Sequence, residues 1–224
     1  KNLQITKQQV KNSVNENSFI IQSIGSVEEI GRSINILVKR LREWYELHNP
    51  EFSLATESHE RFVESILEKE KNELLKELKI DAADSIGADL DQENIEPIRS
   101  LAHQVYDLYR LKESQTSYLS SLMDVFCPNI KAVCGAIVGA MLIEHAGSLR
   151  RLSEMPASTI QILGAEKALF RHMKTGSKPP RHGVIVHHPL IAKANDKMHG
   201  KIARALADKI AIASKVDYFK GQFT

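Results

Sequence analysis

Apolar residues recur at alternating steps of four and three along much of this chain, and this spacing restricts its fold more than any other feature. The first series is Ile30, Ile34, Leu37, Leu41 and Trp44. Residues spaced in this way lie on one face of an α-helix and pack against a second helix. The series predicts a helix over residues 27–48, which Asn49–Pro50 is expected to end.

A second series of the same kind predicts the partner of this helix. It is expected to begin near Glu96–Pro97, because the first turn of a helix tolerates proline, and to end at Pro128–Asn129. Lys112 and Gln115 occupy two positions of the series, where polar residues often fix the register of paired helices. The apolar positions are Leu101, Val105, Leu108, Leu119, Leu122 and Phe126. Together the two helices predict an antiparallel coiled-coil arm.

The segment between the arm helices predicts one more helix and a linker. Residues 59–79 are highly charged and carry Phe62 and Leu74 on their apolar side, whereas residues 81–94 are rich in Asp, Gly and Ala. If the arm helices pair with each other, Phe62 and Leu74 are left with little cover. We therefore expect two copies of the chain to form a homodimer through the arm.

Small residues become frequent after residue 129, which predicts closely packed helices. They include Ala132, Gly135, Ala136, Gly139 and Ala140. Further helices are expected over residues 157–163, over residues 164–176 and over residues 194–215, with Val184–Val186 as a short extended segment. Pro179–Pro180 prevents the middle helix from continuing.

These patterns predict an all-α fold, with a long antiparallel helical coiled-coil arm and a compact helical C-terminal domain. The expected boundaries are residues 1–24 for an N-terminal remnant or linker, residues 25–127 for the dimerisation arm and residues 128–224 for the C-terminal domain. The apolar run Ala132–Ile143 is shorter than the roughly 20 residues that span a bilayer, so no membrane helix is expected.

Charge is distributed unevenly along the chain. The formal net charge is only +2, yet residues 1–160 carry −6 and residues 161–224 carry +8. A basic C-terminal part beside an acidic remainder points to a polyanionic partner for the C-terminal part. Charge alone leaves a second interpretation open, namely a solvated basic helix without a partner.

The sequence offers no arrangement of residues typical of an enzyme or a metal site. Cys127 and Cys134 lack the CxxC spacing of zinc ligands, and His187 and His188 would point to opposite sides of an extended segment. No GxSxG elbow, Walker loop or GxGxxG motif is present. We predict a protein that is not an enzyme and has no metal and no cofactor. Two cysteines and a polar N-terminus without a signal peptide favour a reducing, intracellular setting.

The densest group of cations lies in residues 164–183, GAEKALFRHMKTGSKPPRHG. Lys167, Arg171 and Lys174 are spaced four and three apart and therefore share one face of a helix. Leu169 and Phe170 lie on other sides and are expected to anchor the helix to the core. The cations that continue the strip through the loop are Lys178, Arg181 and His182. Without further aromatics for base stacking, the pattern favours recognition of nucleic-acid backbone and shape.

Four blocks of sequence carry a resemblance to a known family. They are RLREWYELHNPE (40–51), SIGADLDQENIEPIRSLAHQVYDLYRL (85–111), MPASTIQILGAEKALFRHMKTGSKPPRHGVIVHHPLI (155–191) and GKIARALADKIAIASKVDYF (200–219). With these blocks the chain resembles the Nop-domain core proteins of archaeal box C/D guide ribonucleoproteins over nearly its whole length. Relatives of that family are the nucleolar Nop proteins and a spliceosomal pre-mRNA processing factor. The KALFRH–KTG–PP–HG insert resembles the guide-particle members, whereas residues 192–198 depart from the family's bulky aromatic sequence.

The resemblance implies a non-catalytic scaffold for RNA-guided 2′-O-methylation that dimerises through its coiled coil. Its Nop domain would bind a kink-turn guide RNA together with a kink-turn-binding ribosomal-type protein. In the family, an N-terminal domain binds fibrillarin, the methyltransferase that uses S-adenosylmethionine; only residues 1–24 precede the arm here, so fibrillarin would bind only through that missing domain. The resemblance also implies a cytoplasmic protein if the source is archaeal, whereas the eukaryotic relatives are nucleolar.

The resemblance also assigns roles to single residues. Those that would face the composite protein–RNA surface are Gln161, Gly164, Ala165, Glu166 and Lys167. Those that would contact backbone phosphates are Arg171, Lys174, Lys178, Arg181 and His182, with Arg204 on the neighbouring helix. Gly164 and Ala165 lack bulk, which would let a helix N-terminus approach a phosphate. Two alternatives stay open: a spliceosomal-type Nop protein, and a coiled-coil adaptor for protein partners without a role in RNA binding.

Overall fold

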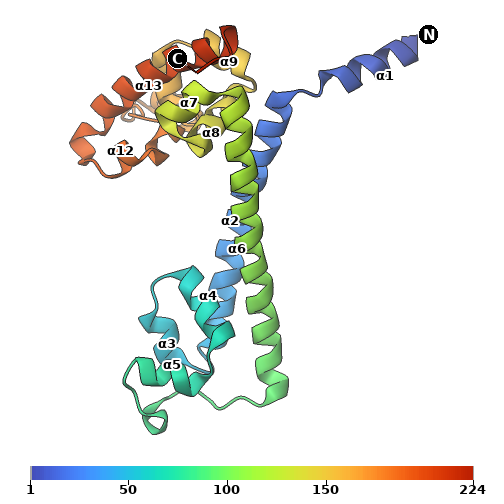
Figure 1. The fold of residues 1–224 in the computed structure, drawn as a ribbon. Coiled ribbons are helices and arrows are strands. Elements are labelled where there is room, and N and C mark those ends of the chain that lie inside the picture. The colour runs from blue at the N-terminus through green and yellow to red at the C-terminus, as the bar shows by residue number, and fades with distance from the viewer. Residues whose placement is uncertain (1, 224) are drawn as a thin grey trace. The chain divides into compact units, whose positions relative to one another are not determined.

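The computed structural model describes the backbone of residues 2–223 and the side chains of residues 3–11 and 14–223. Every regular element in this range is a helix, which confirms the all-α prediction (Figure 1). The chain divides into two compact units: one comprises residues 27–115, and the other comprises residues 1–26 together with residues 116–224. The predicted boundaries at residues 24 and 127 stay a prediction, and their outermost residues, Lys1 and Thr224, lie outside the described residues.

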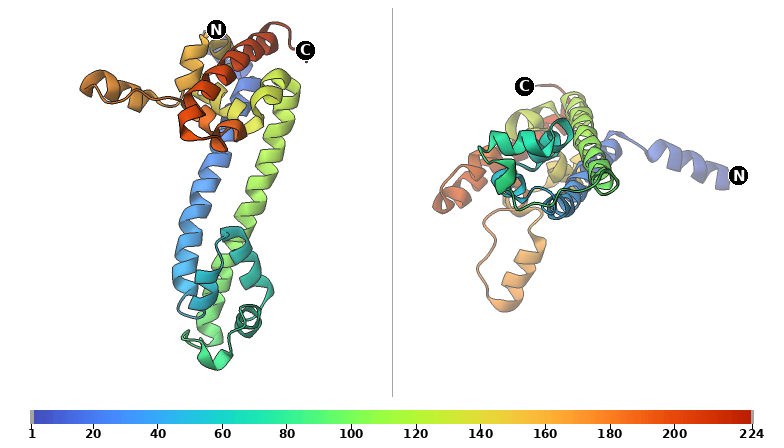
Figure 2. Two further views of the ribbon diagram at one scale, coloured as in Figure 1. Left: turned by 90° about the vertical axis from the view of Figure 1, so that its left-hand side faces the viewer. Right: turned by 90° about the horizontal axis from the view of Figure 1, so that it is seen from below.

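Two long helices, α2 (Glu16–Tyr45) and α6 (Gln92–Phe126), run antiparallel as predicted (Figures 1 and 2). Lys112 lies against α2, because its Nζ is 3.4 Å from where a Cβ of Gly31 would stand. Helix α6 begins at Gln92, about one turn before the predicted start, and includes Pro97. Pro97 is the sixth residue of α6 and lies beyond the four residues whose N–H groups lack an intrahelical partner, so the helix loses one hydrogen bond there, the one to Glu93 O.

The buried face of α2 differs in part from the predicted series. Ile34 and Leu41 are buried as expected, but Trp44 is 37% exposed and Leu37 is only half-buried. Val38 and Tyr45 take their places in the core. An α-helix has 3.6 residues per turn, whereas a heptad series repeats every 3.5 residues. The positions of such a series therefore move gradually around the helix. Packing from other helices then decides which neighbouring position is buried.

Short helices fold back over the end of α2 in the same unit. They are α3 (Pro50–Ala55), α4 (His59–Glu68), α5 (Lys71–Glu77) and the 3₁₀ turn η1 (Ala82–Asp84). The predicted helix over residues 59–79 is therefore wrong as a single helix, because the chain is extended at Lys69 and Glu70 and starts again with a capping box on Glu70 and Glu73.

These short helices bury the side chains that the arm helices leave uncovered. Phe62 and Leu74 are fully buried, and Phe62 contacts the rings of Tyr45 and Phe52 at centroid distances of 5.6 and 5.8 Å. The guanidinium of Arg42 lies 4.3 Å above the Phe62 ring and donates to Ser53 O, Thr56 O and His59 Nδ1. The expectation that Phe62 and Leu74 lack cover is wrong, so they give no reason to expect a homodimer.

The second unit is a bundle built around the last helix, α13 (Asp196–Phe219). Helix α13 packs against α7 (Pro128–Cys134), α9 (Leu149–Glu154) and α10 (Ala157–Ile162). Helix α8 (Ala136–Ala146) packs against α7 and α9, and α12 (Pro189–Ala192) precedes α13. Helix α1 (Asn2–Ser13) begins the chain.

Small residues and one buried carboxylate hold α7 and α8 in this bundle. A Cβ on Gly139 would lie 2.7 Å from Ile130 Cγ2 and 2.9 Å from Met123 Cε, so a larger residue there would force these side chains to move. Asp217 of α13 is buried and accepts hydrogen bonds from the backbone N–H groups of Asn129 and Ile130, which satisfies the first turn of α7. Within the described residues no single helix is long and apolar enough to cross a membrane; α7 and α8 reach that length only as a pair bent by 116°.

One short segment has a different conformation from the one predicted. Residues 184–186 are not extended but belong to a 3₁₀ turn, η2 (Val184–His187). The turn is closed by the Val186 N–H, which donates to Gly183 O, and it buries Ile185 completely. The preceding backbone does pair with another segment, since the N–H groups of Gly183 and Val184 donate to the carbonyls of Gln161 and Leu163.

Candidate nucleic-acid interface

The predicted site residues come from three segments of the C-terminal unit: the end of α10, α11 (Glu166–Thr175) with the turn before it and the loop after it, and the first half of α13. Most predicted site residues are exposed there. The exposed ones are Gly164, Glu166, Lys167, Arg171, Lys174, Lys178, Arg181 and Arg204, whereas Gln161, Ala165 and His182 are half-buried. All eleven residues are thus at the surface of one unit, but they do not form one strip.

Helix α11 and the loop after it project away from the bundle (Figure 2, orange). None of the residues of α11 is buried. The expectation that Leu169 and Phe170 anchor this helix is wrong, because Leu169 is half-buried and Phe170 is 60% exposed. Lys167, Arg171 and Lys174 are all exposed along α11, as their spacing predicted.

The turn that leads into α11 is fixed by Gly164 and Glu166. Gly164 has a φ of +86°, and a Cβ there would collide with Val184, so both conformation and space require glycine. Glu166 Oε1 accepts a 2.7 Å hydrogen bond from the Gly164 N–H. Partial burial acts to raise the pKa of Glu166, but backbone hydrogen bonds and nearby His145 outweigh it, so this pKa is lowered. Glu166 therefore serves the turn as an ionised carboxylate.

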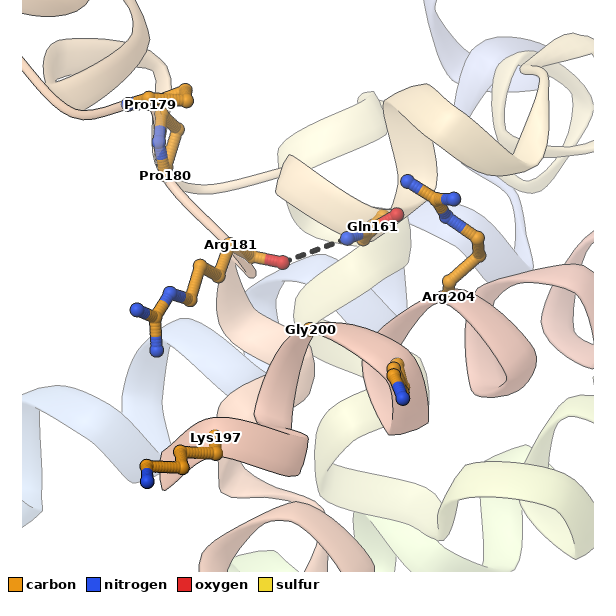
Figure 3. A pocket seen from close by; sticks show the side chains of 8 residues that line it. Gln161, Pro179, Pro180, Arg181, Lys197, Gly200 and Arg204 are labelled. Carbon is orange, nitrogen blue, oxygen red and sulfur yellow. Dashed lines mark hydrogen bonds between the residues drawn. The ribbon is translucent and has the colours of Figure 1, made fainter. Parts of the chain in front are cut away.

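The loop returns to the bundle at Arg181, which is held by two different segments (Figure 3). The side-chain amide of Gln161 donates a 2.7 Å hydrogen bond to Arg181 O. The guanidinium of Arg181 contacts Asp196 of α13, with 3.0 Å between Nη1 and Oδ2. His182 meets the ring of His199 edge-on at 5.7 Å. Arg181 and His182 therefore belong to the surface of α13 rather than to that of α11.

A basic recess opens between this loop, α10 and α13, with a volume of about 610 Å³. We call it the α13 recess, and it is lined by Gln161, Arg181, Lys197, Gly200, Lys201 and Arg204 with the two loop prolines. Lys197, Lys201 and Arg204 are exposed and follow one another by four and three residues along α13. Lys197 and Lys201 were not among the predicted site residues, although the spacing they share with Arg204 is a signal that the sequence contains.

The described residues contain no cluster of three or more His, Cys, Asp or Glu side chains able to hold a metal. Cys127 and Cys134 are buried, and burial raises the pKa of each thiol to about 12, with Asp217 adding to the effect. A thiol with so high a pKa is a poor nucleophile at neutral pH. The chemistry that this surface offers is the binding of anions by Lys and Arg side chains.

Residues 26–224 match the profile of the Nop family, described as "snoRNA binding domain, fibrillarin". A NOP5-family protein of Methanocaldococcus jannaschii is 40% identical over 230 residues, which cover 96% of this chain and 56% of that protein. Nucleolar protein 56 of Caenorhabditis elegans is 39% identical over 223 residues, covering 90% of this chain and 46% of the relative. The chain thus spans about half the length of these relatives. A solved fibrillarin/Nop5p complex contains a chain that superposes with a TM-score of 0.58 at 26% identity, covering 100% of this chain and 68% of the other.

Proposed function

The chain belongs to the Nop family, and from this premise we propose that it is a non-catalytic scaffold of a box C/D guide ribonucleoprotein. Its C-terminal unit binds a kink-turn guide RNA together with a kink-turn-binding ribosomal-type protein. The scaffold positions the machinery of RNA-guided 2′-O-methylation without performing the chemistry. In an archaeal cell it acts in the cytoplasm, and in a eukaryotic cell it acts in the nucleolus.

The observation that carries this proposal is the basic surface of α11 and the α13 recess. Lys167, Arg171 and Lys174 stand on a helix that projects from the bundle, so a ligand can approach them without entering a cavity. Phosphate groups along a nucleic acid are the ligands that such separated, exposed cations fit. Family membership makes this nucleic acid an RNA, since the matching profile is that of a snoRNA-binding domain.

A mobility-shift titration tests the proposal with three ligands: a kink-turn RNA, the kink-turn protein, and their preformed complex. Tight binding is expected only to the complex, because protein and RNA each supply part of the surface. Binding to bare RNA should be weak, and its log K should fall by about 0.7–0.9 per phosphate contact for each unit of log salt. Equal affinity for bare RNA and for the complex would contradict the composite surface.

We place dimerisation on α6. Leu111, Tyr118 and Val125 are spaced by seven residues and are 45%, 48% and 68% exposed. Positions seven apart lie on nearly the same side of a helix, so the three side chains form an apolar stripe. A second copy of the chain with the same stripe would cover it.

Contact with fibrillarin lies outside this sequence in our proposal. The solved relative is a fibrillarin/Nop5p complex, and this chain matches 68% of the corresponding chain there. We assign fibrillarin binding to an N-terminal domain that these 224 residues do not include. A pull-down of purified fibrillarin by this chain should therefore recover no more fibrillarin than an empty resin does.

A further inference from the structure

The α13 recess is separate from the cations of α11, although one continuous basic block of sequence contributes to both. Arg181 reaches the recess from the loop, whereas Lys197, Lys201 and Arg204 reach it from α13. Asp196 pairs with Arg181 at 3.0 Å. Within the part of the chain that the structure describes, no carboxylate forms an ion pair with Lys197, Lys201 or Arg204. Three unpaired cations on successive turns of one helix favour an anionic ligand.

The remaining walls of the recess are two prolines, a glycine and one polar side chain, that of Gln161. Pro179 and Pro180 restrict the loop on one side, and Gly200 adds no side chain to the space between Lys197 and Lys201. The amide nitrogen of Gln161 is occupied by its hydrogen bond to Arg181 O. Its amide oxygen points away from that bond, on the side where Arg204 lies (Figure 3). Gln161 therefore presents a hydrogen-bond acceptor to the recess.

The lining distinguishes a nucleotide from a protein partner. Among the described residues that line the recess, only the two prolines have apolar side chains. The cores of protein–protein interfaces, in contrast, are apolar and depleted of Lys. Lys and Arg are the usual partners of nucleic-acid phosphates. Phosphate oxygens carry no proton at neutral pH, so a nucleotide can donate a hydrogen bond to the Gln161 acceptor only through its sugar or its base. The 2′-hydroxyl of ribose is a donor that RNA has and DNA lacks.

We infer that the α13 recess holds one nucleotide of the RNA, with its phosphate on Lys197, Lys201 and Arg204 and its 2′-hydroxyl donating to Gln161 Oε1. This inference rests on the proposed RNA-binding function and adds a second, ribose-sensing site to the cations of α11. Arg181 stands at the rim of this site, where Asp196 already engages it. Through the Arg181–Asp196 contact, the loop after α11 is attached to α13 beside this site.

The phosphate contacts are tested by salt titration of binding to the preformed complex of kink-turn RNA and kink-turn protein. The double variant Lys201→Ala/Arg204→Ala is compared with Lys209→Ala, which removes a charge from another side of α13. The slope of log K against log salt counts the phosphates that the protein neutralises, so loss of this one phosphate contact in the double variant should reduce the slope by about 1. The affinity of the double variant should fall by about tenfold or more. Lys209→Ala should match the wild type.

The ribose contact is tested with a series of RNAs that each carry one 2′-deoxy nucleotide. At one position of the RNA, the 2′-deoxy substitution should weaken binding by the wild-type protein severalfold. The same substitution should not change the affinity of the Gln161→Met variant, which lacks the acceptor. Unchanged melting temperatures would show that all variants fold. If every 2′-deoxy substitution affects the wild type and Gln161→Met equally, the ribose contact is wrong. If the double variant keeps the wild-type slope of log K against log salt, the phosphate site is wrong. These outcomes differ from the one that would contradict the proposed function, in which the wild type binds the preformed complex no more tightly than bare RNA.

Discussion

Asp196 is the residue at which the charge of the α13 recess is partly neutralised. Its carboxylate lies 3.0 Å from the Arg181 guanidinium, and it also stands 3.7 Å from His199 Nδ1. Both Arg181 and Asp196 are more than half exposed, so the attraction between them is screened by water. An exposed pair of this kind contributes no more than about 1 kcal/mol. The main effect of Asp196 is therefore on the ligand rather than on stability.

Asp196→Asn should raise the affinity for RNA, because it removes a negative charge at the rim and releases Arg181 toward phosphate. The expected gain is up to about fivefold at low salt, since that factor corresponds to about 1 kcal/mol, and it should shrink as salt rises. Binding of the preformed complex is the measurement. Asp124→Asn is the matched control, because Asp124 pairs with Lys131 and does not line the recess. Weaker binding by Asp196→Asn would show that the pair orders the site instead.

Single residues also show where sequence patterns were sufficient and where they were not. The cations of α11 were correctly placed on one exposed face, because helical spacing alone decides that. The role of Phe170 was wrong, since an apolar residue on a helix is buried only if the helix packs against something, and α11 projects. Lys197 was missed because the recess exists only where Gln161 and the loop prolines meet α13. Such a meeting of distant segments has no local signal in the sequence.

At the scale of elements, α11 and the loop after it should respond differently to loss of charge. Lys167→Ala and Arg171→Ala, on the projecting helix, should each weaken binding to the preformed complex by about one decade or more, corresponding to roughly 1.5–3 kcal/mol per charge-assisted contact. Lys178→Ala, in the loop, should cost less, because no helix orients this exposed side chain toward the ligand and water screens its charge. The melting temperature should not change in any of the three, since none of these side chains is buried. If the helix variants bind normally, the cations of α11 are only solvated.

The short helices that cover the end of α2 should make this unit sensitive to pH. Burial lowers the pKa of His48, and burial together with Arg42 and Lys39 lowers the pKa of His59. His59 Nδ1 accepts a 2.9 Å hydrogen bond from Arg42 Nε, which a protonated ring cannot do. A histidine whose pKa is lower in the folded state binds more protons when unfolded, so it disfavours folding once the pH falls below the unfolded value of about 6.5.

The free energy of unfolding should therefore be highest above that pH and should decrease as the pH falls from 7 to 5. Urea titrations across this range, with the histidines replaced as His48→Gln/His59→Gln, provide the measurement. The double variant should lose most of the dependence in this window. Glu51 and Asp89 have lowered pKa values, so their contribution is lost only at more acidic pH and should persist in the variant. If the free energy of unfolding changes between pH 7 and pH 5 by the same amount in the variant and in the wild type, groups other than His48 and His59 cause the change.

Elements were predicted well where one local signal decides them. The two long helices follow from their apolar spacing, and α11 ends at Gly176 as expected because this residue is in the left-handed conformation. The break between α4 and α5 was missed, since a capping box on Glu70 and Glu73 was hidden in a run of charges. The conformation of residues 184–186 depends on Gly183 and on the carbonyls of Gln161 and Leu163, which are tertiary partners.

At the scale of the whole molecule, the proposed homodimer needs an interface other than Phe62 and Leu74, which the chain covers by itself. The stripe of Leu111, Tyr118 and Val125 on α6 offers another explanation, because burying three such side chains stabilises association by roughly 1.5–3 kcal/mol for each one that is fully covered. Light scattering at micromolar concentration should give about twice the chain mass of 25.2 kDa.

The variant Leu111→Glu/Val125→Glu should be a monomer, since it places a carboxylate at both ends of the stripe, where association would bury it. Ile36→Glu is the matched control: Ile36 is 69% exposed on α2 and lies outside the stripe, so this variant should remain a dimer. Circular dichroism should show the same helix content in all three proteins, because each changed side chain is exposed in the single chain. A wild type that is monomeric at every concentration would contradict dimerisation itself. A double variant that stays dimeric while Ile36→Glu dissociates would move the interface from α6 to α2.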